Sequence, residues 1–272
     1  EDTVAIITAI KKLAQSGVDN YTNLADYWMQ TTNQVNSEEK KVAIRNMFSQ
    51  SRVALICGSA GTGKTYLINH ISNLFASKAR LYLAQTNPAV NNLRRKVTAS
   101  ANSSFRTISS FISKKYTGRT SFDILIIDEC STVNNKDMRE VLEKANFELL
   151  VLVGDTYQIE SIEFGNWFDA VRYFLPQTSV CELTEPYRSE SEYLLRVWND
   201  VRKMKDDVYD LLQTFGYSAD LDKSIFSPAG ENEIILCLNY GGLYGINNIN
   251  HFLQECNKGK EIWRGVQRYK VG

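Results

Sequence analysis

The stretch Gly58-Ser59-Ala60-Gly61-Thr62-Gly63-Lys64-Thr65 decides the fold of this chain of 272 residues. It reads Gly-x-x-x-x-Gly-Lys-Thr, follows the apolar run Val53–Cys57, and precedes a helix-like segment that begins at Tyr66. A strand, a glycine loop and a helix in this order form the context of a phosphate-binding loop. The glycines let backbone N–H groups surround a triphosphate, and the helix directs its positive end toward it. The sequence therefore predicts an α/β nucleotide-binding domain.

Each side chain at the end of this loop has an expected role. Lys64 is placed to reach the β- and γ-phosphates of ATP, and the Thr65 hydroxyl is placed to ligate Mg²⁺. Backbone groups of Gly61, Thr62 and Gly63 complete the expected cofactor-binding set. A plain glycine turn would not require the Lys-Thr pair at this place.

Length and composition bound the class of protein. A chain of this length exceeds the usual size of one domain, so we expect a full domain and part of another. The apolar runs are shorter than a membrane span and the N-terminus does not resemble a signal peptide, which predicts a cytoplasmic protein without a membrane partner. Five cysteines, odd in number and widely spaced, indicate reduced core thiols instead of a metal cluster or disulfide framework.

Charge is segregated along the chain although its net value is +0. No Asp or Glu occurs from Lys40 through Phe122, which we call the acid-free block, and this block is rich in Lys and Arg. A positive block of this kind suits polyanions such as nucleotide phosphates and nucleic acid. The alternative is that these charges scatter over the folded surface and are cancelled by acids from other segments.

Functional side chains are expected where further buried strands end. Strand-like runs occur at 80–84, 124–127, 148–153 and 180–183, and the carboxyl ends of parallel strands face the ligand crevice. Asp128 is expected to hold Mg²⁺, and Glu129 to orient and deprotonate the attacking water. Gln158 is a candidate for contacting the γ-phosphate or the water, and Arg188 for neutralising γ-phosphate charge. The alternatives are an ordinary polar loop residue for Gln158 and a surface ion pair for Arg188.

The chain divides into four predicted regions. Residues 1–50 read as a helical N-terminal region, 51–215 as an ATPase domain, 216–231 as a polar linker, and 232–272 as the start of a second domain. Within these regions we expect a third helix that begins at Ser37, a continuous amphipathic helix over 192–215, a strand over 233–238 and a helix over 245–256.

These motifs, in this order, resemble superfamily 1 helicases, particularly the RecD-like branch that moves 5′ to 3′. Gly58 to Thr65 is similar to motif I, Asp128-Glu129 to motif II, Gly154-Asp155-x-x-Gln158 to motif III, and Tyr187-Arg188 to the arginine-bearing motif IV. The resemblance implies a RecA-like P-loop fold with a mainly parallel sheet, and a second RecA-like domain that begins near residue 232. Glu39 stands where the family has an adenine-reading glutamine.

The resemblance also implies a nucleic-acid partner. Gln85-Thr86-Asn87-Pro88-Ala89 is similar to motif Ia and Thr107-Ile108-Ser109-Ser110-Phe111 to motif Ib, which in the family touch single-stranded DNA. Thr86, Asn87 and Thr107, with the neighbouring Arg94, are therefore candidate DNA contacts. The alternative for the basic cluster at 94–96 is a solvated helix face.

The expected activity is an ATP-driven motor on single-stranded DNA, which could act with partner proteins of a DNA-processing complex. Later motifs of the family have no counterpart before residue 272, so we expect a fragment that hydrolyses ATP slowly. One alternative is a nucleotide-dependent switch that gates a protein partner without translocation. Another is a nucleic-acid-binding scaffold with an inactive ATPase, which the intact Lys64, Asp128 and Glu129 disfavour.

Overall fold

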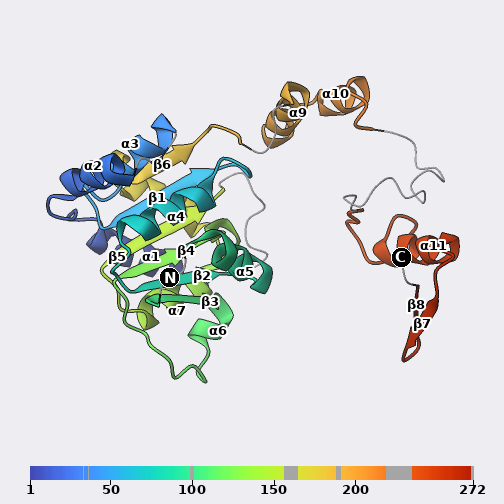
Figure 1. Cartoon of the computed structure of the whole chain (residues 1–272), viewed down its shortest axis with the longest axis horizontal. Helices are drawn as coiled ribbons and strands as arrows, with labels where there is room; N and C mark the ends of the chain where they lie inside the picture. Colours follow the sequence, from blue (N-terminus) through green and yellow to red (C-terminus); the bar gives the residue numbers. More distant parts are fainter. Residues whose placement is uncertain are drawn as a thin grey trace. The chain divides into compact units, whose positions relative to one another are not determined.

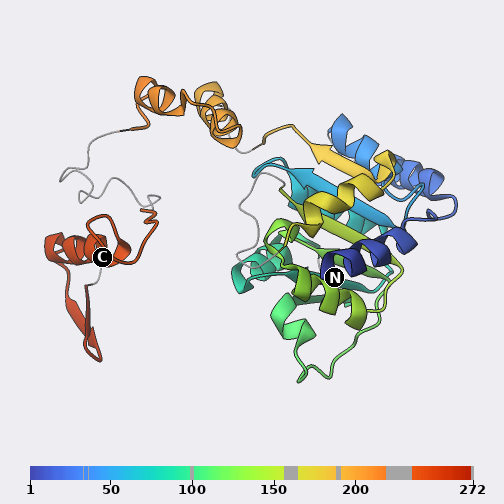
Figure 2. The ribbon, with the colours of Figure 1, turned by 180° about the vertical axis from the view of Figure 1, so that it is seen from behind.

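The computed structural model describes residues 1–32, 34–35, 37–98, 101–155, 165–187, 191–218 and 235–270. The chain forms two compact units, Glu1–Leu195 and Arg196–Gly272, which we call unit 1 and unit 2. Unit 1 contains a six-stranded sheet with helices on both faces (Figures 1 and 2).

All pairings in the unit 1 sheet are parallel, and the strand order is β3-β2-β4-β5-β1-β6. This sheet confirms the α/β fold predicted from the phosphate-loop context and the mainly parallel, RecA-like sheet that the motif resemblance implies. The strands are β1 (Val53–Gly58), β2 (Arg80–Ala84), β3 (Ser103–Thr107), β4 (Ile124–Ile127), β5 (Leu149–Gly154) and β6 (Val180–Leu183). Every strand except β3 lies within one residue of a predicted run.

The central strands are apolar on both sides because helices cover both faces of the sheet. Successive side chains of a strand point to opposite faces, so Ala54 and Ile56 of β1 enter one hydrophobic cluster while Val53, Leu55 and Cys57 enter the other. The first cluster includes residues of α2 (Tyr21–Thr32), α3 (Glu38–Asn46), α4 (Lys64–Leu74) and α5 (Asn87–Lys96). The second includes residues of α1 (Asp2–Leu13), α6 (Ile108–Ile112), α7 (Asn135–Lys144) and α8 (Trp167–Val171). Short 3₁₀ turns lie at η1 (Cys130–Thr132), η2 (Arg172–Phe174) and η3 (Gln177–Ser179).

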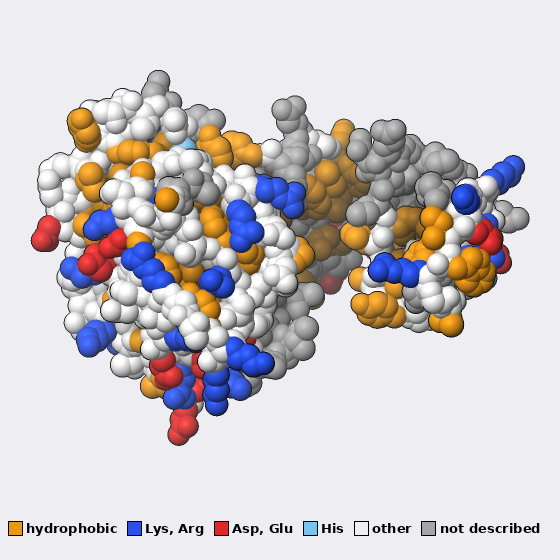
Figure 3. Space-filling model, turned by 60° about the horizontal axis from the view of Figure 1, so that its bottom comes forward, with side chains coloured by type: hydrophobic (Ala, Val, Ile, Leu, Met, Phe, Trp, Pro, Cys, Tyr) orange, Lys and Arg blue, Asp and Glu red, His pale blue; other side chains and the backbone are white. Residues whose placement is uncertain are grey.

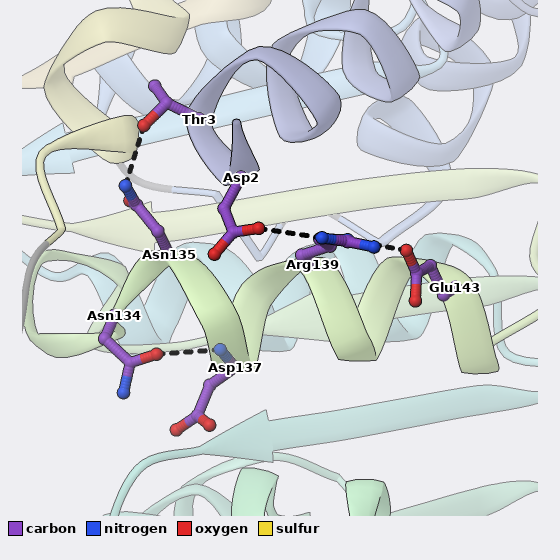
Figure 4. Close-up of polar contacts among 7 residues, drawn as sticks. All are labelled: Asp2, Thr3, Asn134, Asn135, Asp137, Arg139 and Glu143. Atoms are coloured by element: carbon purple, nitrogen blue, oxygen red, sulfur yellow. Dashed lines mark hydrogen bonds and ion pairs between the residues drawn. The ribbon is translucent and has the colours of Figure 1, made fainter.

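The N-terminal helices are layers of this unit. Ile6 and Ile10 of α1 are almost completely buried against the sheet. Arg139 of α7 makes ion pairs with Asp2 (2.8 Å) and with Glu143 (2.7 Å), and Asn135 donates a hydrogen bond to Thr3 (Figure 4). On the other face α3 begins as expected, with the Ser37 hydroxyl accepting from the Lys40 N–H as an N-cap.

Strand order brings three loops to one edge of the sheet. β5 lies between β1 and β4, with Cys57 opposite Gly154 and Ile127 opposite Leu152. Because the strands are parallel, the phosphate loop after β1, the acids after β4 and Asp155 after β5 leave the sheet on the same side. This edge is the ligand crevice of open α/β sheets.

Unit 2 holds most of α9 (Glu192–Arg202), followed by α10 (Val208–Thr214), α11 (Ile246–Cys256) and the antiparallel pair β7 (Glu261–Arg264) and β8 (Gln267–Lys270). The expected continuous helix over 192–215 is wrong. Met204 adopts a left-handed conformation (φ 48°), and the Lys205 N–H bonds to the Asp200 carbonyl at 3.1 Å, which is the Schellman pattern that ends a helix. The helix expected from residue 245 is confirmed as α11.

A second correction concerns the strand expected over 233–238. Residues 233 and 234 lie outside the described residues, and 235–238 form no strand. Leu236 and Leu238 are exposed, and 235–238 pair with no strand among the described residues. The sequence analysis missed the β7–β8 hairpin, whose turn contains Gly265 in a left-handed conformation (φ 64°).

Cysteine burial agrees with the predicted core thiols at three of five positions. Cys57, Cys130 and Cys181 are buried, Cys237 is half-buried and Cys256 is exposed, and all five are free thiols. Among the described residues, no group of three or more His, Cys, Asp or Glu side chains could hold a metal ion. No helix formed by the described residues has both the length and the apolar character required to cross a membrane.

Candidate functional site

Hydrogen bonds within the phosphate loop stabilise its conformation. Gly61 and Gly63 have positive φ angles of 90° and 88°, which L side chains rarely adopt. The Lys64 ammonium donates to the carbonyl oxygens of Gly58 (2.7 Å) and Ser59 (3.0 Å). The Thr62 hydroxyl donates a hydrogen bond to the Ser59 carbonyl at 2.9 Å. The Thr62 side chain is buried inside the loop and does not line the pocket.

A pocket of about 580 Å³ opens over the loop at the carboxyl edge of the sheet. Its wall contains Lys64 and Thr65 from the start of α4, Asp128 and Glu129 after β4, and Asp155 after β5. Four predicted catalytic or metal-binding residues, 64, 65, 128 and 129, therefore line one cavity. Gly61 and Gly63 of the cofactor-binding set also line it.

The two acids that follow β4 are desolvated. Burial raises the pKa of the Asp128 carboxyl, while the Glu129 N–H and the charges of Lys64 and Lys96 lower it in part. Burial and the neighbouring Asp128 charge raise the pKa of Glu129. Burial penalises the ionised form of both carboxyls, and a bound cation would relieve that penalty. The Thr65 hydroxyl and the Asp128 carboxylate are hard oxygen donors, so the site fits Mg²⁺.

Glu129 has an unusual backbone conformation. Its φ of 57° is left-handed, and its N–H donates to Asp128 Oδ1 at 2.9 Å. Its carbonyl accepts from the Thr132 hydroxyl at 2.8 Å. Non-glycine residues in this conformation are strained and cluster at functional sites. The 3₁₀ turn η1 thus holds Glu129 at the pocket.

Four side chains of the pocket wall, from Tyr66, Asn92, Lys96 and Tyr187, were not predicted to be part of the site. Tyr66 and Tyr187 are about half exposed and line the cavity, with Asn92 and Lys96 from α5. Tyr66 directly follows the motif, and Tyr187 directly precedes Arg188, so proximity to those motifs was the available signal. Lys96 was assigned with Arg94 and Arg95 to a basic cluster, but it lines the pocket, because helix residues one or two apart do not share a face.

Gln158 and Arg188 lie outside the described residues, so their roles stay predictions. The neighbouring segment is informative, because the Tyr187 N–H donates to the Gly61 carbonyl at 2.9 Å. The chain after β6 is therefore tied to the phosphate loop one residue before Arg188.

The candidate DNA-contacting residues lie on two adjacent strand ends. Ala84 of β2 pairs with Thr107 of β3, so the loops that follow these strands are neighbours. Thr86 caps α5 by accepting from the Ala89 N–H, and Thr107 caps α6 by accepting from the Ser110 N–H. Thr86 and Asn87 are exposed, and Arg94 lies over the Phe105 ring of β3 at 5.6 Å.

Many cations of the acid-free block are exposed and make no ion pair with the described acids. Lys40 and Arg80 are buried, and Lys41, Arg45 and Lys78 pair with acids. Among the described residues, seven exposed cations of α5, of β3 and of the loop after α6 make no ion pair: Arg94, Arg95, Lys96, Arg106, Lys114, Lys115 and Arg119. The face in Figure 3 shows Lys and Arg side chains spread over the larger body, some of them beside Asp and Glu side chains and others without an acid next to them.

Known proteins match this chain in sequence and in fold. A family model described as an AAA domain matches residues 35–217. A probable conjugal transfer protein TraA from Sinorhizobium fredii is 29% identical over 163 residues, which cover 58% of this chain and 14% of that protein. The chain therefore spans about one-seventh of the length of the curated relative.

Two solved helicases share the fold. The Pif1 helicase from Candida albicans has a TM-score of 0.55 and 19% identity, over 84% of this chain and 56% of that one. A Bacteroides Pif1 structure bound to single-stranded DNA has a TM-score of 0.53 and 18% identity, over 81% of this chain and 57% of that one. With the family match, this likeness confirms the RecA-like helicase fold expected from the motifs.

Proposed function

The chain belongs to the AAA domain family, and from this premise we propose that it is the ATP-hydrolysing motor domain of a superfamily 1 DNA helicase. The observation that carries the proposal is the pocket lined together by Lys64, Thr65, Asp128 and Glu129. A nucleotide-binding loop next to two desolvated acids is an arrangement for hydrolysis as well as for binding.

The residues of the pocket divide the work of phosphoryl transfer. Lys64 and the loop N–H groups stabilise the charge of the β- and γ-phosphates. Thr65 and Asp128 would hold Mg²⁺, which supplies neutralisation of phosphate charge when bound. Glu129 orients a water and accepts its proton as the water oxygen bonds to the γ-phosphorus and the bond to the bridging oxygen breaks, which leaves ADP and inorganic phosphate. Tyr66 and Tyr187 offer aromatic faces for a base.

Single-stranded DNA is the proposed track. Thr86, Asn87 and Thr107 lie at neighbouring strand ends, and Arg94 with the other exposed cations of α5 and β3 supplies positive charge near them. Such a surface binds the phosphate backbone without reading sequence. The Bacteroides Pif1 protein is bound to single-stranded DNA in its crystal structure, which supports this class of partner for a chain of the same fold.

Other parts of the proposal rest on the motif resemblance. Gln158 would contact the γ-phosphate or the attacking water, and Arg188 would neutralise γ-phosphate charge. The region over 232–272 would begin a second RecA-like domain after a linker over 216–231. The proposed direction of movement, from 5′ to 3′, and the proposed partner proteins of a DNA-processing complex also rest on that resemblance.

A DNA-stimulated ATPase assay on the full-length protein tests the motor. We expect hydrolysis to rise several-fold on addition of a single-stranded oligonucleotide and to fall to background in Lys64→Ala. Nucleotide binding that persists without any stimulation by single strands would contradict a motor and point to a switch that gates a protein. Hydrolysis unaffected by Lys64→Ala would remove the pocket from the chemistry.

A further inference from the structure

Helix α3 is bonded to the segment that leads from β6 into the nucleotide pocket. Glu39 Oε1 accepts hydrogen bonds from the Thr184 N–H (2.7 Å) and from the Thr184 hydroxyl (2.8 Å). The Ser37 hydroxyl donates to Glu185 Oε2 at 2.9 Å. The start of α3 is therefore hydrogen-bonded to two successive residues, Thr184 and Glu185, of a segment almost 150 residues away in sequence.

Lys40 of α3 and Tyr187 of the segment after β6 are also in contact. The Tyr187 hydroxyl donates to Glu185 Oε2 at 2.5 Å, and the Lys40 ammonium lies 3.9 Å from the centroid of the Tyr187 ring. Tyr187 is thus held at its hydroxyl by an anion and on one face by a cation. Its side chain is nevertheless 54% exposed and lines the pocket, so part of the ring remains available to a ligand.

Lys40 is an unusual residue in this arrangement. It is 2% exposed, and no carboxylate among the described residues lies within ion-pair distance of its ammonium. Its contacts are with the pocket, because a Cβ built on Gly63 would lie 2.9 Å from Lys40 Cε. The side chain therefore packs between the phosphate-loop turn and the Tyr187 ring.

We propose that Lys40 is a positioning residue for the nucleotide site: α3, through Lys40, fixes the Tyr187 ring as a wall of the pocket. The proposal rests on the proposed function, since it takes the pocket to bind a nucleotide. Tyr187 is bonded through its N–H to Gly61, so the same contacts hold the segment before Arg188 against the phosphate loop. An N-terminal helix that contributes no lining residue to the cavity thereby controls its shape.

The experiment measures the dissociation constants of ADP and ATP for the full-length protein and its variants. Lys40→Met keeps the length of the side chain but removes the charge, and loss of a desolvated cation–π contact predicts about tenfold weaker binding. The loss should be equal for ADP and ATP, because it acts through the ring. Lys40→Arg should restore most of the affinity. Lys41→Met is the matched control, since Lys41 is a partly exposed neighbour paired with Glu38, and we expect wild-type binding.

A double-mutant cycle separates positioning from folding. Tyr187→Leu should weaken binding as much as Lys40→Met, and the double variant should be no weaker than either single variant. Binding unchanged in Lys40→Met, losses that add in full, or a loss that grows from ADP to ATP would each overturn the proposal; the last would assign Lys40 to the phosphates. Wild-type protein that binds no nucleotide would instead refute the proposed function.

Discussion

At the scale of single residues, the phosphate loop tolerates no side chain at its last glycine. Gly63 has a φ of 88°, and a Cβ there would approach the Lys40 side chain at 2.9 Å. Gly63→Ala is therefore expected to lower both thermal stability and nucleotide affinity, the left-handed backbone alone costing about 1 kcal/mol. Gly216→Ala is the control, because Gly216 is also left-handed (φ 71°) but has nothing within 4 Å of an added Cβ. Equal nucleotide affinity in the two variants would contradict the packing argument.

Cysteine reactivity should divide by burial. Burial raises the pKa of Cys57 to about 11 and that of Cys181 to about 12, and it also raises the pKa of Cys130. At pH 8 these thiols stay protonated, and only the thiolate reacts. A thiol reagent should modify Cys256 fastest under native conditions and reach the three buried thiols only after denaturation. Rapid native labelling of Cys181 would show that β6 opens from the sheet edge.

The sequence predicts the motif residues of the site better than it predicts the other side chains that line the pocket. Lys64, Thr65, Asp128 and Glu129 were identified because each belongs to a motif that needs a fixed residue type. Tyr187 and Lys96 were not predicted to line the pocket, because their place in the cavity depends on packing between elements distant in the chain. The Tyr187 ring lines the pocket, and Tyr187 contacts Lys40 of α3 and Gly61 of the phosphate loop.

At the scale of elements, α1 should contribute strongly to the stability of unit 1. Ile10 is completely buried against the sheet, whereas Val4 on the same helix is 68% exposed. Ile10→Ala should lower the free energy of unfolding by about 3 kcal/mol, since it removes buried methylene groups and leaves a cavity. Val4→Ala is expected to change it little. Chemical denaturation of both variants checks this, and a similar loss in each would mean that α1 docks loosely.

Strand predictability followed hydrophobic content. Five strands of the sheet are mainly apolar and mainly buried, and their residue types alone predict them: β1, β2, β4, β5 and β6. β3 reads Ser-Ser-Phe-Arg-Thr, and it forms because the β2 edge offers backbone partners and Phe105 stacks on Tyr82 at 4.4 Å. The apolar run before residue 238 shows the converse, since no strand of the described residues pairs with 235–238. Pairing partners are a tertiary property that local sequence does not contain.

At the scale of the whole molecule, a neutral chain folds into a unit with a charged end. The acids that balance the acid-free block lie largely elsewhere in the sequence, so the exposed cations of α5, β3 and the loop after α6 remain unpaired among the described residues. The cations of α5 and β3 lie beside β2 and β3, whereas the loop after α6 leads to the start of β4, and the pocket lies over the carboxyl ends of β4, β5 and β1. Under the proposed function, hydrolysis and strand binding would therefore use neighbouring parts of one sheet edge.

This segregation predicts which arginines set the salt dependence of DNA binding. Arg94 and Arg95 lie on α5 beside β3, whereas Arg52 is equally basic and exposed but precedes β1 at the opposite edge of the sheet. Removing Arg94 and Arg95 together should weaken binding of an oligothymidine and lower the slope of log affinity against log salt by about 0.7 per lost phosphate contact. Arg52→Ala should leave the slope unchanged. Fluorescence anisotropy at several salt concentrations measures both, and an equal effect of Arg52→Ala would show that overall charge, and not a surface at β2 and β3, holds the strand.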